Sequence, residues 1–246
     1  MTFTFHVERW AAWAAADSPD PDACIETASQ WQAWARGDIA ISAQERNPAL
    51  PFIAPMLRRR LSRLSRLALK VAYIAAEDNH TLPTVFCSRH GEIHRTRGLL
   101  NDLAAGERLS PMAFSLSVHN TASGLYSIAS GNTAPSTAIA AGRDTLAMAA
   151  VEAAGLLLQH PQVLLVFADE PLPGDYREFA DESTAAFGLA LLLNRDTGDT
   201  WTLSATGSHT AATDECMGLA LLRALASGSG NACTAGERHG WLWAQA

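Results

Sequence analysis

Residues 143–169 carry the feature that most constrains the fold. The segment RDTLAMAAVEAAGLLLQ, residues 143–159, has helical length and small or apolar side chains on nearly every face. It is followed by QVLLVFAD, residues 162–169, an unbroken apolar run typical of a strand covered on both sides. A helix and a strand without a polar side both need neighbours all around, so the pair predicts a layered α/β domain with a buried central helix.

Further segments alternate between strand and helix patterns. Strands are expected at 2–10, 84–91, 136–141, 185–194, 200–207 and 240–245. Helices are expected at 24–38, 55–78, 92–107, 118–130 and 214–227, the fourth of them buried. With 48% apolar residues in 246, the chain can fill one core, so we expect a single domain over residues 1–246 with a mixed sheet.

Composition excludes several classes of function. A net charge of −7 and a pI near 5.6 argue against nucleic acid as the main partner, because phosphates need a basic surface. The four cysteines are far apart and form no CxxC pair, which indicates reduced thiols rather than disulfides or a zinc site. No run is long and apolar enough to span a membrane, and residues 1–20 lack a signal-peptide core. We therefore expect a cytoplasmic protein without a cofactor.

Three short patterns resemble catalytic or metal motifs incompletely. The nucleophile elbow G-x-S-x-G is absent, because Ser123 lacks the first glycine. Ser117 and His119 are two residues apart, so on a helix their side chains diverge. His90 and His94 have the spacing of a zincin helix, but Glu92 does not directly follow the first histidine, so we expect no metal. A hydrolase or acyltransferase using Ser117 or Ser123 remains an alternative.

The helix expected at 55–78 is strongly basic on one side. Leucines recur at helical spacing, and six cations occupy the remaining positions, among them Arg58, Arg59, Arg63 and Arg66. A solvated helix surface is the common explanation for such a pattern. In an acidic protein, however, this local reversal of charge also favours an acidic partner.

Residues 110–135, SPMAFSLSVHNTASGLYSIASGNTAP, contain a motif that resembles β-ketoacyl-ACP synthases. The synthase pattern S-P-F-F-x₆-N-x-x-[AS]-G-x₃-I-x-x-G-x₃-P matches without a gap at Ser110, Pro111, Asn120, Gly124, Ile128, Gly131 and Pro135. The resemblance covers roughly residues 1–206. With PMLRRRLSRLS and VFCSRHGE, the chain looks most like the short chain-length-factor-like proteins of bacterial aryl-polyene pathways. It implies the N-terminal half of a thiolase-like fold.

The resemblance also shows what is missing. Active synthases carry a cysteine nucleophile in T-A-C-x-[ST]-G before the buried helix, where the helix dipole lowers its pKa. Here PSTAIAAG leads directly into that helix: Ala140 and Ala141 stand where the thiol belongs, Gly142 follows, and about four residues are absent. The second half of active synthases, which supplies two histidines, has no counterpart. The resemblance therefore implies a subunit that is not an enzyme.

Such a subunit is expected to work as the partner of an active synthase. In synthase dimers the S-P-F-F segment helps to close the partner's acyl tunnel, which implies that role for Met112, Ala113 and Phe114, with Ser117, His119 and Asn120 at the interface. Ala113 replaces a Phe, which would lengthen the tunnel. Arg58, Arg59, Arg63, Arg66 and Arg108 would dock an acyl carrier protein or the synthase. A partner that only stabilises the synthase is the remaining alternative.

Overall fold

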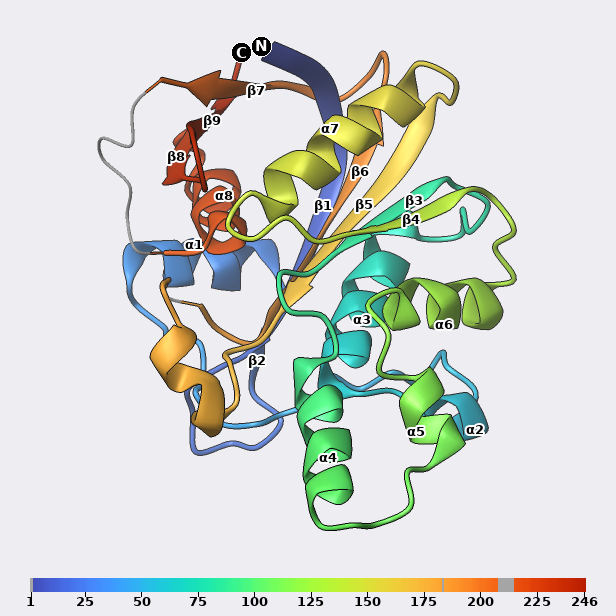
Figure 1. The fold of residues 1–246 in the computed structure, drawn as a ribbon. Coiled ribbons are helices and arrows are strands. Elements are labelled where there is room, and N and C mark those ends of the chain that lie inside the picture. Colours follow the sequence, from blue (N-terminus) through green and yellow to red (C-terminus); the bar gives the residue numbers. More distant parts are fainter. Residues whose placement is uncertain (1, 183, 208–214) are drawn as a thin grey trace.

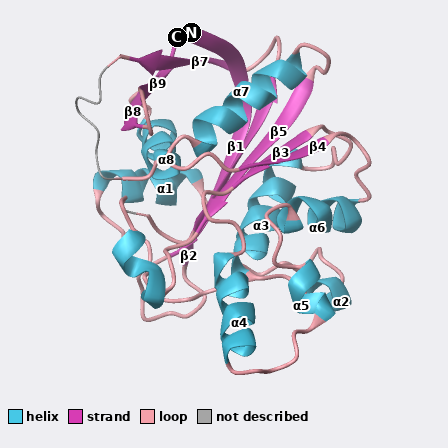
Figure 2. Cartoon of the chain, in the orientation of Figure 1, coloured by secondary structure: helices cyan, strands magenta, loops and turns pink. Residues whose placement is uncertain are grey.

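The computed structural model describes residues 2–182, 184–207 and 215–246. A nine-stranded sheet runs through these residues, and helices cover both of its faces (Figures 1 and 2). The strands are β1 (Thr2–Ala15), β2 (Cys24–Ile25), β3 (Thr84–Cys87), β4 (Ser136–Ile139), β5 (Gln162–Asp169), β6 (Phe187–Asn194), β7 (Asp199–Thr206), β8 (Asn231–Ala235) and β9 (Gly240–Gln245).

The sheet is mixed, as predicted. Its strands are ordered β4-β3-β5-β6-β1-β7-β9-β8, with β2 paired to β1 off this path. β3 runs parallel to β4 and β5, and the other pairs of the described sheet are antiparallel. Because they run parallel, β3, β4 and β5 have their carboxyl ends at one edge of the sheet. β4 is the outermost strand of the sheet on that side, next to β3.

The helices form two layers. They are α1 (Ala28–Arg36), α2 (Pro55–Arg58), α3 (Arg63–Ala76), α4 (Ile93–Ala104), α5 (Pro111–Ser115), α6 (Thr121–Ser130), α7 (Thr145–Leu157) and α8 (Met217–Ser227), with a 3₁₀ helix, η1, at Gly174–Phe179. A hydrophobic core lies on each face of the sheet, and successive side chains of β5 point into one core and then the other. Leu165 lies in the core with α7 and α8, whereas Leu164 lies in the core with α3 and α6. The apolar run of β5 is thus covered on both faces, which confirms the α/β prediction.

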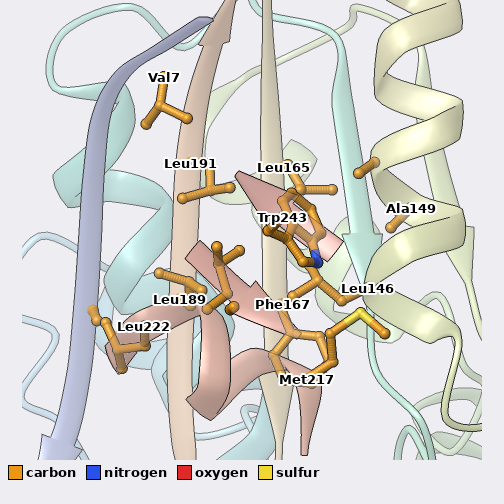
Figure 3. Close-up of a cluster of buried hydrophobic side chains, with 14 of the residues drawn as sticks. Val7, Leu146, Ala149, Leu165, Phe167, Leu189, Leu191, Met217, Leu222 and Trp243 are labelled. Carbon is orange, nitrogen blue, oxygen red and sulfur yellow. The ribbon is translucent and has the colours of Figure 1, made fainter. Parts of the chain in front are cut away.

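Helix α7 is buried less completely than the sequence predicts. Its inner face, including Leu146 and Ala149, packs on β5 and β3 beside Trp243 (Figure 3). On its outer face Met148 and Val151 are only half-buried, and Leu158 just beyond the helix is 82% exposed. The prediction of burial on all sides is therefore wrong for the outer face. Among the described residues, only one layer of sheet lies against the helix.

The predicted basic helix is two helices. α2 ends at Arg58, and α3 begins at Arg63 after a non-helical link. Ser62 causes the restart, because its hydroxyl accepts a hydrogen bond from the Ser65 amide, 3.0 Å away, and so caps α3. Leu61, in the link, is buried instead of following a helical stripe.

Smaller differences occur near both ends of the chain. Residues 24–25 form β2 rather than the start of a helix, because a Thr27–Gln30 capping box begins α1 only at Ala28. The first strand continues to Ala15, five residues beyond the expected end. In the Gly/Ser-rich stretch after α8, residues 231–235 form an unpredicted strand, β8, paired with β9. No helix of the described residues is long and apolar enough to cross a membrane.

Candidate functional site

The edge where β4, β3 and β5 end is the first place to look for chemistry, because α/β sheets commonly bind ligands at the carboxyl ends of parallel strands. β4 leads there into residues 140–144 and α7. β3 leads into Ser88 and Arg89, and β5 ends at Asp169. Each sequence-predicted residue near this edge can therefore be compared with what surrounds it.

The turn before α7 contains no nucleophile. It consists of Ala140, Ala141 and Gly142, and Gly142 adopts a left-handed conformation with φ +59°. Thr145 holds the turn closed: its hydroxyl donates to the Gly142 carbonyl at 2.7 Å and accepts from the Ala141 amide at 3.0 Å. The hydroxyl of Thr145 is thus engaged within the turn, and the alanines have no reactive atom.

None of the three buried or half-buried cysteines has an activated thiol. Cys87 is buried in β3, and burial together with the nearby Asp169 carboxyl raises the pKa of its thiol well above the usual value. Burial raises the pKa of Cys216 to about 12, and burial also raises that of Cys24. A thiol with a raised pKa is protonated at neutral pH and is a poor nucleophile. Cys233 is exposed on β8, on the opposite side of the sheet order from β4.

The two candidate serines have partners other than histidine. The Ser117 hydroxyl donates to the Phe114 carbonyl at 2.8 Å, and the Ser123 hydroxyl lies 2.6 Å from that of Ser136. His119 points elsewhere: its Nε2 is 2.8 Å from the Ser88 carbonyl oxygen. Neither hydroxyl therefore has the adjacent base that an activated serine needs.

The two histidines of the incomplete metal motif are also separated. His94 Nε2 lies 2.9 Å from the Pro171 carbonyl oxygen, whereas His90 lines a cavity. Across the part of the chain that the structure describes, no three His, Cys, Asp or Glu side chains are arranged to hold a metal ion.

A cavity of about 230 Å³ opens at this edge of the sheet, and three charged residues of its lining, Arg89, Asp181 and Glu182, are paired with one another. Arg89 lies 2.7 Å from Asp181 and 2.9 Å from Glu182, and Asp181 is also 3.1 Å from Arg143, which precedes α7. Hydrogen bonds from Arg89, with a smaller contribution from Arg143, lower the pKa of Asp181 to about 2. Burial raises the pKa of Glu182, although Arg89 opposes the shift. The network joins the ends of β3 and β4 to the segment before β6.

Asp169 is a buried acid in the lining of this cavity. Its carboxylate accepts hydrogen bonds from the Ser88 hydroxyl at 3.3 Å and from the Glu170 amide at 3.2 Å. Burial nevertheless raises its pKa to about 7. Sequence reasoning missed Arg89, Asp181 and Glu182 altogether and treated Asp169 only as the end of a strand. An acid ending an unbroken apolar run was the available signal.

The segment after Ser110 presents apolar side chains to solvent. The Ser110 hydroxyl caps α5 by accepting from the Ala113 amide, 3.3 Å away. On this short helix Met112 is 55% exposed and Phe114 62% exposed, while Ala113 is half-buried. Large exposed apolar side chains that lie close together are typical of a protein interface.

Helix α6 and the residues before it also carry exposed apolar side chains, and they correct another expectation. The predicted buried helix over 118–130 begins at Thr121, and it is buried only on the side of Leu125 and Tyr126. Val118 is 46% exposed and Ile128 72% exposed. The open edge of β4 lies next to α6 in the fold (Figure 1). We call the exposed side chains of Met112, Phe114, Val118 and Ile128, with the β4 edge, the α5–α6 surface.

The remaining predicted interface residues differ in exposure: Asn120 is exposed, whereas Ser117 and His119 are half-buried. His119 is half-buried and lines a small apolar pocket with Phe86 and Ala122. Asn120 immediately precedes α6, and its carbonyl accepts from the Gly124 amide at 3.0 Å. The His119 side chain therefore faces into the protein at the start of α6, whereas the residue Asn120 is exposed as Phe114 is.

The predicted basic residues divide into two groups. Arg63 forms an ion pair with the buried Glu170 and keeps only 14% of its side chain exposed. Arg58 and Arg66 donate to the carbonyls of Leu50 and Arg58, at 3.1 and 2.8 Å. Within the described residues, the exposed side chains of Arg59 and Arg108 have no hydrogen bond or ion pair.

Comparison with known proteins identifies the class. The model for the β-ketoacyl synthase N-terminal domain matches residues 31–244, so the chain belongs to this family. The match extends past residue 206, where the resemblance seen in the sequence stops, and it includes β8 and all but the last residue of β9. No curated protein matches the chain.

Solved structures place the chain within the class more narrowly. A chain from the complex of the ketosynthase ApeO with its chain length factor ApeC, from Xenorhabdus doucetiae, is similar at 29% identity with a TM-score of 0.81. The alignment covers 98% of this chain and 99% of that one. The ishigamide ketosynthase/chain length factor gives 16% identity and a TM-score of 0.62, over 92% of this chain and 74% of the other.

A β-ketoacyl synthase from Burkholderia phymatum STM815 gives 12% identity and a TM-score of 0.63, over 93% of this chain and 71% of that one. At these lower identities the likeness concerns the fold alone. This likeness, together with the match to the chain of the ApeO–ApeC complex over 98% of this chain at 29% identity, confirms the predicted thiolase-like ketosynthase fold with its mixed sheet.

Proposed function

We propose that this protein is a non-catalytic partner of an active β-ketoacyl synthase, a chain length factor, and that it binds the synthase through the α5–α6 surface. The observation that carries the proposal is the contrast at residues 110–142. Met112 and Phe114 are exposed and apolar, whereas the turn before α7 has no nucleophile and no activated cysteine nearby. Similarity to a chain from a ketosynthase–chain length factor complex supports the same role.

The physical task of such a subunit is steric. An acyl chain stops growing when its next two carbons would overlap a rigid wall, since overpacking costs about 1 to 3 kcal/mol or more. In our proposal Met112, Ala113 and Phe114 form part of that wall in the partner's tunnel. The small side chain at Ala113 leaves space for a long, rigid product of the polyene type.

We also propose that an acyl carrier protein, or an acidic surface of the synthase, docks on the free cations. Arg59 and Arg108 are exposed and unpaired within the described residues, so their charge is available to an acidic partner. Arg58 and Arg66 have their guanidinium groups bound to backbone carbonyls. Arg63 contributes less to this docking, because Glu170 already neutralises it.

Co-expression with the β-ketoacyl synthase of the same pathway tests the proposal. We expect a stable heteromeric complex that survives affinity purification and gel filtration, and we expect the chain alone to release no thiol from an acyl thioester. A chain that stays monomeric beside the synthase, or that turns over the thioester by itself, would contradict the proposal. Loss of such turnover in Ser117→Ala or Ser123→Ala would establish the serine enzyme instead.

A further inference from the structure

The link between α5 and α6 is tied to the sheet through one side chain. His119 lies in this link, and its Nε2 is 2.8 Å from the carbonyl oxygen of Ser88, the first residue after β3. Because a carbonyl oxygen only accepts, Nε2 donates this bond. Among the described residues, every other hydrogen bond of 110–121 stays within 110–125. His119 therefore makes the polar connection between the α5 segment and the end of β3.

Gly91 lets the His119 ring reach this carbonyl. Gly91 has a left-handed conformation with φ +56°, which favours glycine, and a Cβ there would lie 2.8 Å from His119 Cδ2. Real Cβ atoms do not come that close to other atoms, and moving the ring aside would break its bond to Ser88. The turn of residues 88–91 thus both packs against the ring and accepts its hydrogen bond.

This turn is itself held in place by the sheet. The Gly91 amide donates to the Ser88 hydroxyl at 2.9 Å, and that hydroxyl donates to the Asp169 carboxylate at 3.3 Å. Ser88 and Asp169 are both buried, at the ends of β3 and β5. Leu116, at the end of α5, is half-buried against the core, but apolar packing is not directional. The directional contact that fixes the segment is the bond of His119.

We propose that His119 is a positioning residue: it fixes α5 against β3 and so sets where the tunnel wall of residues 112–114 stands. The ring is half-buried and faces into the protein, so it acts on product length through α5 without touching the acyl chain. The effect on product length rests on the function proposed above, whereas the attachment of α5 does not. Without the bond, the wall yields to a growing chain, and products become longer and less uniform.

Hydrogen exchange in the free chain tests the attachment alone. His119→Phe keeps a ring but has no donor for the Ser88 carbonyl. We expect the amides of residues 113–116 to exchange about fivefold faster, the size that loss of one net hydrogen bond predicts. His94→Phe is the matched control, because His94 Nε2 also lies 2.9 Å from a carbonyl oxygen, that of Pro171, and it should leave these amides unchanged. Equal exchange in His119→Phe and wild type would overturn the proposal.

The products of the complex with the synthase test the consequence. In His119→Phe we expect the share of the main product to fall at least about twofold and longer products to appear, since a less firmly held wall costs less to overpack. His119→Gln, whose amide nitrogen extends as far as Nε2, should restore the wild-type distribution. His119→Asn, one methylene shorter, should not. The Gln and Asn variants differ in reach alone, so this pair decides the matter if His119→Phe does not fold.

Comparison with Ala113→Phe separates this proposal from the function on which it rests. If Ala113→Phe shortens the product while the Gln and Asn variants at position 119 give the same distribution, the role of His119 in product length is overturned. If Ala113→Phe itself leaves the product unchanged, the wall is in the wrong place, and exchange at residues 113–116 alone decides whether His119 fixes α5.

Discussion

The α5–α6 surface and the sheet edge around the turn before α7 differ in whether their side chains have partners within the chain. Met112 and Phe114 stand in solvent without partners, although burial of such side chains is favourable. At the other region Arg89 and Arg143 are paired with acids of the same chain, and the Glu237 carboxylate accepts a hydrogen bond from the Arg143 amide. The apolar side chains of the first region can be buried only by another molecule, whereas the charges of the second are paired within the chain. This difference favours binding over catalysis.

The largest expected effect comes from placing a charge on the unsatisfied surface. Phe114→Asp should weaken synthase binding about 1,000-fold, equivalent to roughly 4 kcal/mol, because an unpaired carboxylate would be buried where an aromatic anchor packs. Phe179→Asp is the matched control, since Phe179 is 66% exposed on η1 and Phe114 is 62% exposed. Titration of each variant against the purified synthase measures the change. Equal effects of the two substitutions would remove α5 from the interface.

The next effect tests whether internal pairing holds the other region together. Arg63→Met should lower the free energy of unfolding by about 3 kcal/mol, because it leaves the buried Glu170 carboxylate without a counter-ion. Arg59→Met, which removes an exposed and unpaired cation, should change it by less than about 0.5 kcal/mol. Urea denaturation of both variants provides the comparison. Similar stabilities would show that Arg63 contributes no more to the free energy of unfolding than Arg59 does.

A smaller effect concerns the buried acid at the cavity. Burial raises the pKa of Asp169 from 3.8 in an exposed carboxyl to about 7. The folded state therefore favours the protonated form, and stability is lost as the pH rises between these two values. Asp169→Asn mimics the protonated form, so it should match wild type near pH 4 and exceed it by about 2 kcal/mol above pH 7, less than the full shift converts to. Thermal unfolding across this range measures the difference, with Asp196→Asn as the exposed control. A constant difference at all pH values would contradict it.

Much of the fold could be predicted because buried faces of helices and strands require apolar residues at regular positions in the sequence. The unbroken apolar run of residues 162–169 identified a strand covered on both faces, and β5 is that strand. The break between α2 and α3 was missed because Leu61 continues the leucine spacing although it lies in a link, where a serine cap outweighs the pattern. β8 was missed because its exposed Asn231 and Cys233 carry no strand signal apart from pairing with β9.

The site was predictable only where it depends on residue identity. That residues 140–142 contain no nucleophile could be read directly, and the resemblance indicated why it matters. The pairing of Arg89 with Asp181, or of Arg143 with Glu237, joins residues about ninety apart, and no local pattern encodes such contacts. Arg63 illustrates the opposite error, because a cation on a basic stripe was expected to be free and is instead paired with Glu170.

The most direct test of the central claim is the length of the product made by the complex of this chain with its synthase. Ala113→Phe enlarges the side chain that we place at the tunnel wall, while Thr197→Phe adds the same ring on the exposed turn after β6. We predict that Ala113→Phe shortens the main product by at least about two carbons, since the added ring overpacks the wall, and that Thr197→Phe leaves it unchanged. An unaltered product distribution from an intact Ala113→Phe complex would show that the chain stabilises the synthase without setting chain length.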